Sequence, residues 1–143
     1  MAADPPVPET TPGRMVPRPE GLNAEFYAHC ARGELRFQRC DGCGRWRHPP
    51  RVLCATCGSD RYTWVRSSGR GRVHTWTVTH RAANPAFAGE VPYAVLVVEM
   101  EEGPRLVGNL RGLDPGELAL DLPVVVELEP LSERIALTHF RPA

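Results

Sequence analysis

Two short cysteine motifs constrain this chain more than any other feature of its sequence. Residues 40–43 read Cys-Asp-Gly-Cys, residues 54–57 read Cys-Ala-Thr-Cys, ten residues separate the two pairs, and glycine directly follows each of them. Each pair can present two thiolates from one tight turn, and two such turns complete a tetrahedral sulfur site. The glycines tolerate the left-handed backbone that directs N–H groups toward the sulfurs. The pattern predicts one structural zinc ion per chain, bound by Cys40, Cys43, Cys54 and Cys57.

The sequence supports other uses of the four cysteines less well than zinc binding. Disulfides would suit a secreted chain, and the Pro-rich N-terminus lacks an apolar export signal. A thioredoxin-type redox motif needs a single C-x-x-C at the start of a helix in a βαβ unit. Iron in the same cage stays open as an alternative, because its geometry barely differs from that of zinc. With four protein thiolates as ligands, the metal has no open position for a catalytic water, so we expect a structural role.

A short helix is predicted just before these motifs. Leu22, Phe26 and Cys30 fall at helical spacing, Asn23 is a candidate N-cap, and Gly33 is placed to end the helix. The fifth cysteine, Cys30, is then a small apolar group on the buried face rather than a nucleophile. A helix of about ten residues is marginal alone, so it must pack on the rest of this chain or on a partner subunit.

The remaining sequence is rich in short strand patterns. Alternating apolar residues lead into Cys40, and a return strand is expected over 61–65. Turn signals separate five further strand candidates, at 72–80, 93–100, 105–110, 124–128 and 134–140. We therefore predict a mainly β chain with a short N-terminal helix, a rubredoxin-like zinc ribbon and a five-stranded OB-fold barrel. The expected divisions are a Pro-rich tail or linker over 1–20, helix and ribbon over 21–68, and the barrel over 69–143.

Charge is balanced overall and polarised along the chain. All 17 basic residues are arginine, which excludes lysine Schiff bases and phosphate-loop lysines. Residues 31–81 hold eleven arginines and three acidic residues, whereas residues 82–143 hold four arginines and ten acidic residues. No stretch approaches the roughly 20 apolar residues of a membrane span. We expect a cytoplasmic protein without a membrane segment.

Candidate binding residues gather between the cysteine pairs. Arg45, Arg47 and Arg51 surround Trp46 and His48 in the densest basic cluster of the sequence. This cluster is predicted either to grip the phosphates of a nucleotide cofactor or an acidic partner, or to be an ordinary solvated surface.

Catalytic signals are weak by comparison. His74 and His80 are spaced to share a strand face with Trp76 and Val78, where they either frame a pocket or occupy ordinary barrel positions. Glu99, Glu101 and Glu102 look like a solvated strand end, and no hydrolase, protease or phosphate-loop motif occurs. We predict no catalytic residue.

Several of these motifs together resemble a known family. They are the paired C-x-x-C-G turns, Pro49-Pro50, the run Ser-Gly-Arg-Gly-Arg-Val at 68–73, and Pro92-Tyr93. The chain resembles, from about Leu22 to Pro142, the acyl-CoA-associated zinc-ribbon/OB-fold family known as domain-of-unknown-function family thirty-five. The resemblance implies metal ligation by the four motif cysteines, and the family offers no established catalytic residue to carry over.

The resemblance also implies a role. Such proteins are non-catalytic accessory subunits of thiolase-superfamily enzymes that act on acyl-CoA thioesters. Among their partners are acetyl-CoA acetyltransferase-like enzymes, hydroxymethylglutaryl-CoA synthase-like enzymes and the lipid-transfer-protein type of aldolase. In steroid side-chain degradation of the cholesterol and bile acid type, members are fused behind, or stand beside, a MaoC-type hydratase and assist a retro-aldolase. The expected assembly is a heterotetramer around the enzyme dimer, and the Pro-rich N-terminus would suit a linker to such a hydratase.

Two expectations concern how the chain meets its partners. Phe26 and Tyr27 are the predicted interface anchors, because aromatic side chains dominate binding hot spots. The alternative function is an OB-fold/zinc-ribbon nucleic-acid-binding module, which would need a positive groove with exposed aromatic platforms. The acidic charge of the barrel half and its few aromatic residues disfavour that alternative.

Overall fold

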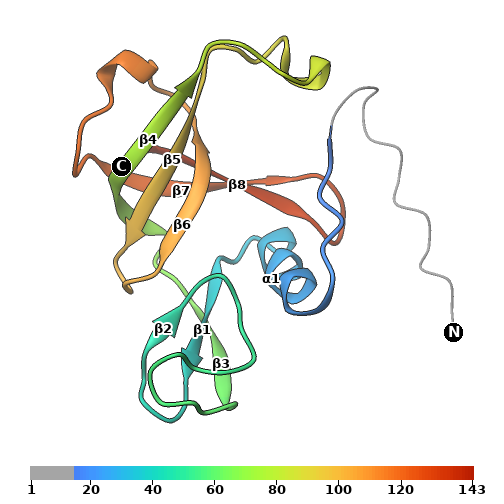
Figure 1. Cartoon of the computed structure of the whole chain (residues 1–143), viewed down its shortest axis with the longest axis vertical. Helices are drawn as coiled ribbons and strands as arrows, with labels where there is room; N and C mark the ends of the chain where they lie inside the picture. Colours follow the sequence, from blue (N-terminus) through green and yellow to red (C-terminus); the bar gives the residue numbers. More distant parts are fainter. Residues whose placement is uncertain (1–14) are drawn as a thin grey trace, which may run out of the picture.

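The computed structural model describes residues 15–143 of the chain (Figure 1). The predicted Pro-rich tail over 1–20 falls mostly outside the described residues, and residues 15–20 carry no helix or strand. A three-stranded sheet lies at one end of the molecule, a closed barrel at the other, and the single α-helix of the described residues lies beside their junction (Figure 1). The mainly β fold predicted from the sequence is confirmed.

The helix α1 spans Gly21–Ala31 and buries one face. Phe26 is 5% exposed and Cys30 is 1% exposed, as the helical spacing predicts. The helix ends in a Schellman motif, in which the Gly33 N–H donates to the Cys30 carbonyl (2.9 Å) and Gly33 has a φ of +81°. The predicted cap at Asn23 is wrong, because the helix already begins at Gly21 and its N-cap residue makes no side-chain cap hydrogen bond. No helix in residues 15–143 is long and apolar enough to cross a membrane.

The small sheet forms from three antiparallel strands in the order β2-β1-β3. The strand β1 (Arg36–Cys40) delivers the first cysteine, β2 (Trp46–Arg47) follows the first cysteine turn, and β3 (Tyr62–Arg66) returns after the second. Because β1 lies in the centre, both cysteine turns are attached to one short ladder. This is the arrangement expected of a zinc ribbon.

Five strands close into a barrel in the order β4-β5-β6-β8-β7. Numbered within the barrel, they run first, second, third, fifth, fourth, which is the strand order of an OB-fold. The pair β6/β8 is parallel, and the remaining pairs are antiparallel. Their bounds are Arg70–Thr79 (β4), Tyr93–Met100 (β5), Arg105–Leu110 (β6), Pro123–Pro130 (β7) and Ala136–Pro142 (β8).

A β-bulge bends β4 and decides where its side chains point. The register against β5 shifts between Val73 and Thr75, so His74 is the extra residue on the bulged strand. Strict alternation would place His74 on the same face as Trp76. Instead His74 is exposed while Trp76 packs against the core, so the predicted histidine face does not form. A bulge at this position helps a long strand turn between two neighbours, which barrel closure requires.

The helix, ribbon and barrel share one continuous core. Phe26 of the helix, Phe37 of the ribbon, and Phe140 and Leu96 of the barrel belong to the same buried cluster, and α1 packs against β1, β7 and β8. None of the three parts therefore buries its apolar residues alone. The ribbon is held against the barrel by side chains rather than tethered to it.

The connection between ribbon and barrel is fixed by two glutamates. The Ser68 N–H donates to Glu102 Oε1 (2.6 Å), and the Ser68 hydroxyl donates to Glu101 Oε2 (2.7 Å). Both carboxylates come from the turn after β5, which the sequence suggested was merely solvated. The chain turns at Gly69, whose φ is +75°, whereas Gly71 already belongs to β4. Hydrogen bonds from Ser68 to Glu101 and Glu102 therefore fix the bend between ribbon and barrel.

We expect Gly108→Ala to destabilise the barrel by about 1–3 kcal/mol, since overpacking a well-filled core has this effect. An added Cβ at Gly108 would lie 2.7 Å from the Thr138 carbonyl oxygen and 2.9 Å from the Phe140 ring. Gly89→Ala is the matched control, because nothing lies within 4 Å of its Cβ position. Urea unfolding of the two variants measures the difference, and equal stability would contradict the close approach of β6 and β8.

Candidate metal centre

Two nearly identical backbone turns position the four cysteines. In the first turn the Gly44 N–H donates to the Cys40 carbonyl at 2.9 Å, and in the second the Gly58 N–H donates to the Cys54 carbonyl at 2.9 Å. The two glycines have φ values of +75° and +74°, so each takes the left-handed conformation that the sequence predicted. Glycine reaches this conformation without steric cost. The repeated C-x-x-C-G pattern therefore produces a repeated turn.

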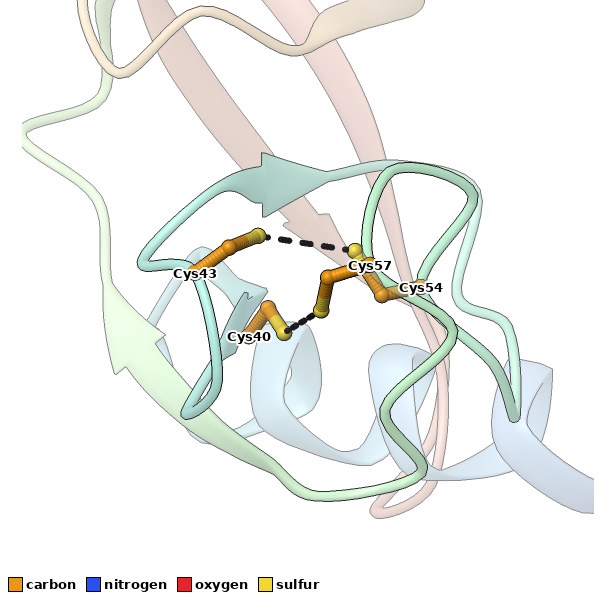
Figure 2. A group of neighbouring side chains, drawn as sticks. All are labelled: Cys40, Cys43, Cys54 and Cys57. Atoms are coloured by element: carbon orange, nitrogen blue, oxygen red, sulfur yellow. Dashed lines mark hydrogen bonds between the residues drawn. The ribbon is translucent and has the colours of Figure 1, made fainter.

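The sulfur atoms of these turns converge on one point (Figure 2). The four Sγ atoms all lie within 4.8 Å of one another, with 3.5 Å between Cys40 and Cys57 and 3.7 Å between Cys43 and Cys54. A disulfide requires about 2.05 Å. Tetrahedral zinc with Zn–S bonds of about 2.3 Å requires sulfur–sulfur edges of about 3.8 Å. The donor set and the spacing thus fit one zinc ion, and when bound the metal would cross-link the two turns.

The local hydrogen bonds also suit metal binding. The pKa of the Cys54 thiol is lowered to about 6 by backbone N–H groups of Cys57 and Thr56, and the pKa of Cys40 is lowered chiefly by the backbone N–H of Cys43. At Cys57 the backbone N–H of Ser59 lowers the pKa, but hydrogen bonding with the neighbouring cysteine sulfurs raises it to about 11. Without a metal, the cluster therefore favours the thiolate forms of Cys40 and Cys54 and disfavours deprotonation of Cys57. A bound divalent cation would stabilise all four thiolates, including that of Cys57.

The fifth cysteine is chemically different. Cys30 is 1% exposed on α1 and is not a member of the sulfur cluster. Burial raises the pKa of its thiol to about 12, so it stays protonated at neutral pH. The prediction of a small apolar core group is confirmed.

The structure brings the predicted arginines together around one cavity. Arg45, Arg47 and Arg51 line a cavity of about 240 Å³ together with Trp46. Their side chains differ in what they contact. Arg45 donates from Nη1 to Thr56 Oγ1 (2.7 Å), and Arg45 and Arg51 are exposed while Arg47 is half-buried. A role of this cluster in binding stays a prediction.

Arg47 takes part in a clamp that the sequence did not reveal. Gln38, which is 0% exposed, accepts hydrogen bonds at Oε1 from Arg47 Nε (2.8 Å) and from the Arg51 backbone N–H (2.8 Å). Arg47 Nη2 in turn donates to the Arg51 carbonyl (2.9 Å), and its guanidinium lies 5.2 Å from the Tyr62 ring centroid. Two side chains thus hold both backbone polar groups of Arg51. No sequence motif marks a buried glutamine of this kind.

The predicted interface aromatics, Phe26 and Tyr27, lie in the middle of the helix α1. Phe26 is buried against His48, with ring centroids 4.7 Å apart, and meets Tyr27 edge-on at 5.5 Å. Tyr27 is half-buried, and both aromatics line a cavity of about 290 Å³ with Pro17. In this chain Phe26 therefore serves the core. An interface role for the pair stays a prediction.

His139 belongs to a separate polar cluster on the barrel. Its Nε2 lies 2.7 Å from Glu129 Oε2, and the same oxygen accepts a hydrogen bond from Arg111 Nη2 (2.7 Å). Desolvation lowers the pKa of His139. His74 and His80 are both exposed, and neither belongs to the β7/β8 pair that holds this cluster.

We expect the purified protein to hold about one zinc ion per chain, and Cys40→Ser or Cys57→Ser to lose it. Structural zinc contributes on the order of 10 kcal/mol to the folding of small thiolate sites, so these variants should lose the ribbon. Metal analysis and amide hydrogen exchange of residues 36–66 measure both effects. Cys30→Ala is the matched control and should keep its zinc. One bound iron per chain, with the colour of an iron–thiolate site, would contradict zinc as the native metal.

A second prediction concerns His48, whose ring packs between Phe26 and Phe37 at centroid distances of 4.7 and 5.4 Å. Burial lowers its pKa to about 4, whereas an unfolded histidine titrates near 6.5. A lowered histidine pKa gives stability that is fully present above pH 6.5 and is lost as the pH falls toward 4. Relative to His48→Leu, wild type should lose roughly 2–3 kcal/mol between pH 7 and pH 4.5. Parallel pH profiles in urea unfolding would contradict this burial.

Comparison with known proteins assigns the two parts of this fold. The family described as "ChsH2, rubredoxin-like zinc ribbon domain" matches residues 28–63, and "ChsH2, C-terminal OB-fold domain" matches residues 64–129. Among solved structures, a chain of the "Ltp2-ChsH2(DUF35) aldolase" superposes with a TM-score of 0.80 and 37% identity, covering 89% of this chain and 98% of that one.

Curated relatives fall into two groups. A "probable enoyl-CoA hydratase alpha subunit" of Thermomonospora curvata is 38% identical over 94% of this chain, and the "3-oxo-4,17-pregnadiene-20-carboxyl-CoA hydratase alpha subunit" of Mycobacterium tuberculosis is 38% identical over 77%. The chain spans only 42% and 34% of the lengths of these two proteins. A "DUF35 domain-containing scaffold protein" of Methanocaldococcus jannaschii is 29% identical over 66% of this chain and 67% of its own length.

The matched profiles together run from residue 28 to residue 129, which covers the cysteine turns and the barrel through most of β7. The solved relative extends the likeness over nearly its whole chain at 37% identity. The sulfur cluster described above lies inside the zinc-ribbon match. This protein therefore belongs to the ChsH2-type DUF35 family of zinc-ribbon/OB-fold proteins.

Proposed function

We propose that this chain is an accessory subunit that binds and supports a thiolase-superfamily enzyme acting on acyl-CoA. The observation that carries the proposal is the likeness to the chain of the Ltp2-ChsH2(DUF35) aldolase, at a TM-score of 0.80 over 98% of that chain. A fold by itself is a poor guide to function. Here the likeness also includes 37% sequence identity, and relatives are named as scaffold proteins or as subunits.

The metal centre supports a structural rather than a chemical part in the reaction. The four thiolates fill a tetrahedral shell, so a bound zinc ion would have no position for water or substrate. In the proposed assembly the partner enzyme cleaves the carbon–carbon bond, and this chain supplies a rigid surface beside it. We place two copies of the chain on an enzyme dimer, as a heterotetramer, because a two-fold dimer presents every surface patch twice.

The substrate class is proposed from the relatives. The relative from Mycobacterium tuberculosis is named for a steroid-derived acyl-CoA, and the matched complex is named an aldolase. We propose a retro-aldolase step in steroid side-chain degradation as the reaction supported. Because both hydratase relatives are more than twice as long as this chain, a MaoC-type hydratase is the further companion that we propose. The four closely spaced thiols suit a reducing compartment, so the assembly that we propose is a cytoplasmic one.

The arginine cluster has a place in this proposal. Arg45 and Arg51 are exposed on a ribbon that is rich in positive charge. Guanidinium groups bind phosphates and carboxylates bidentately. The cluster would thus attract either the phosphates of coenzyme A or an acidic surface of the partner enzyme.

The decisive experiment is co-expression of this chain with the thiolase-like aldolase of the same organism. We expect one size-exclusion peak that contains equal amounts of both chains, and cleavage of a steroid β-hydroxyacyl-CoA only when both are present. The ribbon variant Cys40→Ser should lose both the complex and the activity, whereas Cys30→Ala should keep them.

Two results would overturn the proposal. One is a pair of separate peaks at micromolar concentrations of both proteins. The other is an aldolase whose stability and kcat/KM are the same with and without this chain. Binding of single-stranded oligonucleotides that weakens steeply with salt would instead favour the nucleic-acid alternative.

A further inference from the structure

One pair of neighbouring apolar side chains stands out on the surface. Val52 is 64% exposed and Leu53 is 57% exposed, and both lie in the loop that joins the two cysteine turns. Among the described residues the other exposed large apolar side chains, Met15, Val107 and Leu120, are not neighbours in sequence. Single exposed apolar residues are ordinary on protein surfaces, whereas neighbouring exposed apolar residues are a feature of contact surfaces.

We propose that Val52 and Leu53, with the cavity beside them, form the surface that docks this chain onto its thiolase-like partner. The proposed occupant is a folded protein surface with an apolar socket for the two side chains and acidic groups around it. This inference rests on the proposed function and adds which part of the ribbon makes the contact. We call residues 51–53 the ribbon tip.

The cavity beside the ribbon tip has the composition of an interface core. Its volume is about 240 Å³, and Trp46, Pro49 and Pro104 contribute apolar walls while Arg45 and Arg51 contribute charge. Tryptophan and arginine are the residue types most enriched in binding hot spots. Pro104 belongs to the turn between β5 and β6, so the cavity lies where the barrel meets the ribbon. A partner that filled it would contact both parts of the chain.

Hydrogen bonds fix the backbone on both sides of Val52 and Leu53. The side chains of Gln38 and Arg47 bond both the N–H and the carbonyl of Arg51. On the other side, Leu53 directly precedes Cys54, whose N–H donates to the Ser59 carbonyl at 2.9 Å. A loop fixed at both ends loses little conformational entropy on binding, which favours affinity. This gives a function to the buried glutamine, which the zinc turns do not require.

Charge indicates the chemistry of the partner surface. Residues 31–81 carry eleven arginines against three acidic residues. Arg51 directly precedes the apolar pair, and Arg45 lines the cavity to which Arg51 also contributes. Basic groups beside an apolar pair are complementary to an apolar socket that has aspartate and glutamate at its edge. Coenzyme A alone would satisfy the arginines but would leave Val52 and Leu53 in water. Only a protein surface uses both features.

The test compares two exposed apolar sites in the complex of the full chain with the aldolase. Val52→Asp/Leu53→Asp should weaken the affinity by at least about 30-fold, the fold-change that corresponds to a hot spot of 2 kcal/mol. Leu120→Asp is the matched control, because Leu120 is 67% exposed and lies in the loop between β6 and β7 of the barrel. It should keep its affinity within about threefold. Biolayer interferometry with immobilised aldolase gives both values.

The same variants are also tested for correct folding and for binding of coenzyme A. Zinc content and melting temperature of each variant show whether the ribbon is intact, and Val52→Ser/Leu53→Ser provides a milder second variant. Titration with coenzyme A alone tests the small-molecule use of the arginines. Binding of coenzyme A to wild type and to the ribbon-tip variants, with no loss of aldolase affinity in those variants, would overturn the docking surface.

The outcomes separate the inference from the proposed function. If wild type itself fails to bind the aldolase, the proposed function fails. If wild type and the zinc-loaded ribbon-tip variants bind equally well, the complex stands and the ribbon tip is not its contact. An equal loss of affinity in Leu120→Asp would also overturn the ribbon tip as the specific site.

Discussion

The convergence of four cysteine sulfurs is the constraint on which the ribbon depends. Its sheet contains one strand of only two residues and two of five, too little to bury a core of its own. A metal ion bound to all four sulfurs would close the chain between Cys40 and Cys57 and fix both turns. The ladder between β1 and β3 lies at the two ends of that closed segment, and the loop with Val52 and Leu53 lies inside it. The remaining apolar residues of the ribbon are buried only because the helix and the barrel share their core with it.

This arrangement suits a protein that acts through its surface. A saturated metal shell supplies no reactive water, and the cavity at the ribbon is lined by arginine, tryptophan and proline rather than by paired acids and bases. The fold instead provides rigid contacts. Glu102 bonds the backbone at Ser68, Arg47 bonds the backbone of Arg51, and the helix α1 packs against both the ribbon and the barrel. Rigid placement of a contact surface is the property that a scaffold or an accessory subunit requires, and relatives of this chain carry such names.

Elements with a short-range signal were predictable, and the departures have local causes. The strands of the barrel follow alternating apolar patterns, so their positions were expected to within a few residues. The helix end was readable because Gly33 adopts a conformation that favours glycine. Its beginning was not, since the expected cap Asn23 lies inside the helix. The face shared by His74 and Trp76 failed because one bulge residue in β4 reverses the alternation, and pairing with β5 rather than local sequence decides where a bulge falls.

The sequence by itself determined the metal ligands, because two C-x-x-C-G turns have a geometry that depends almost entirely on residues within five positions. Period-two apolar patterns and turn residues also determined the fold class. The lack of lysine among the 17 basic residues excluded reactions that need a lysine side chain of this chain. Only the tertiary structure decided how those parts are used. It packed Phe26 against His48 in a core shared with the barrel, bonded Arg47 to Gln38, and bonded Glu101 and Glu102 to Ser68. Each of these pairings joins residues distant along the chain or buries a side chain against another element, and such contacts arise from packing, which local patterns do not encode.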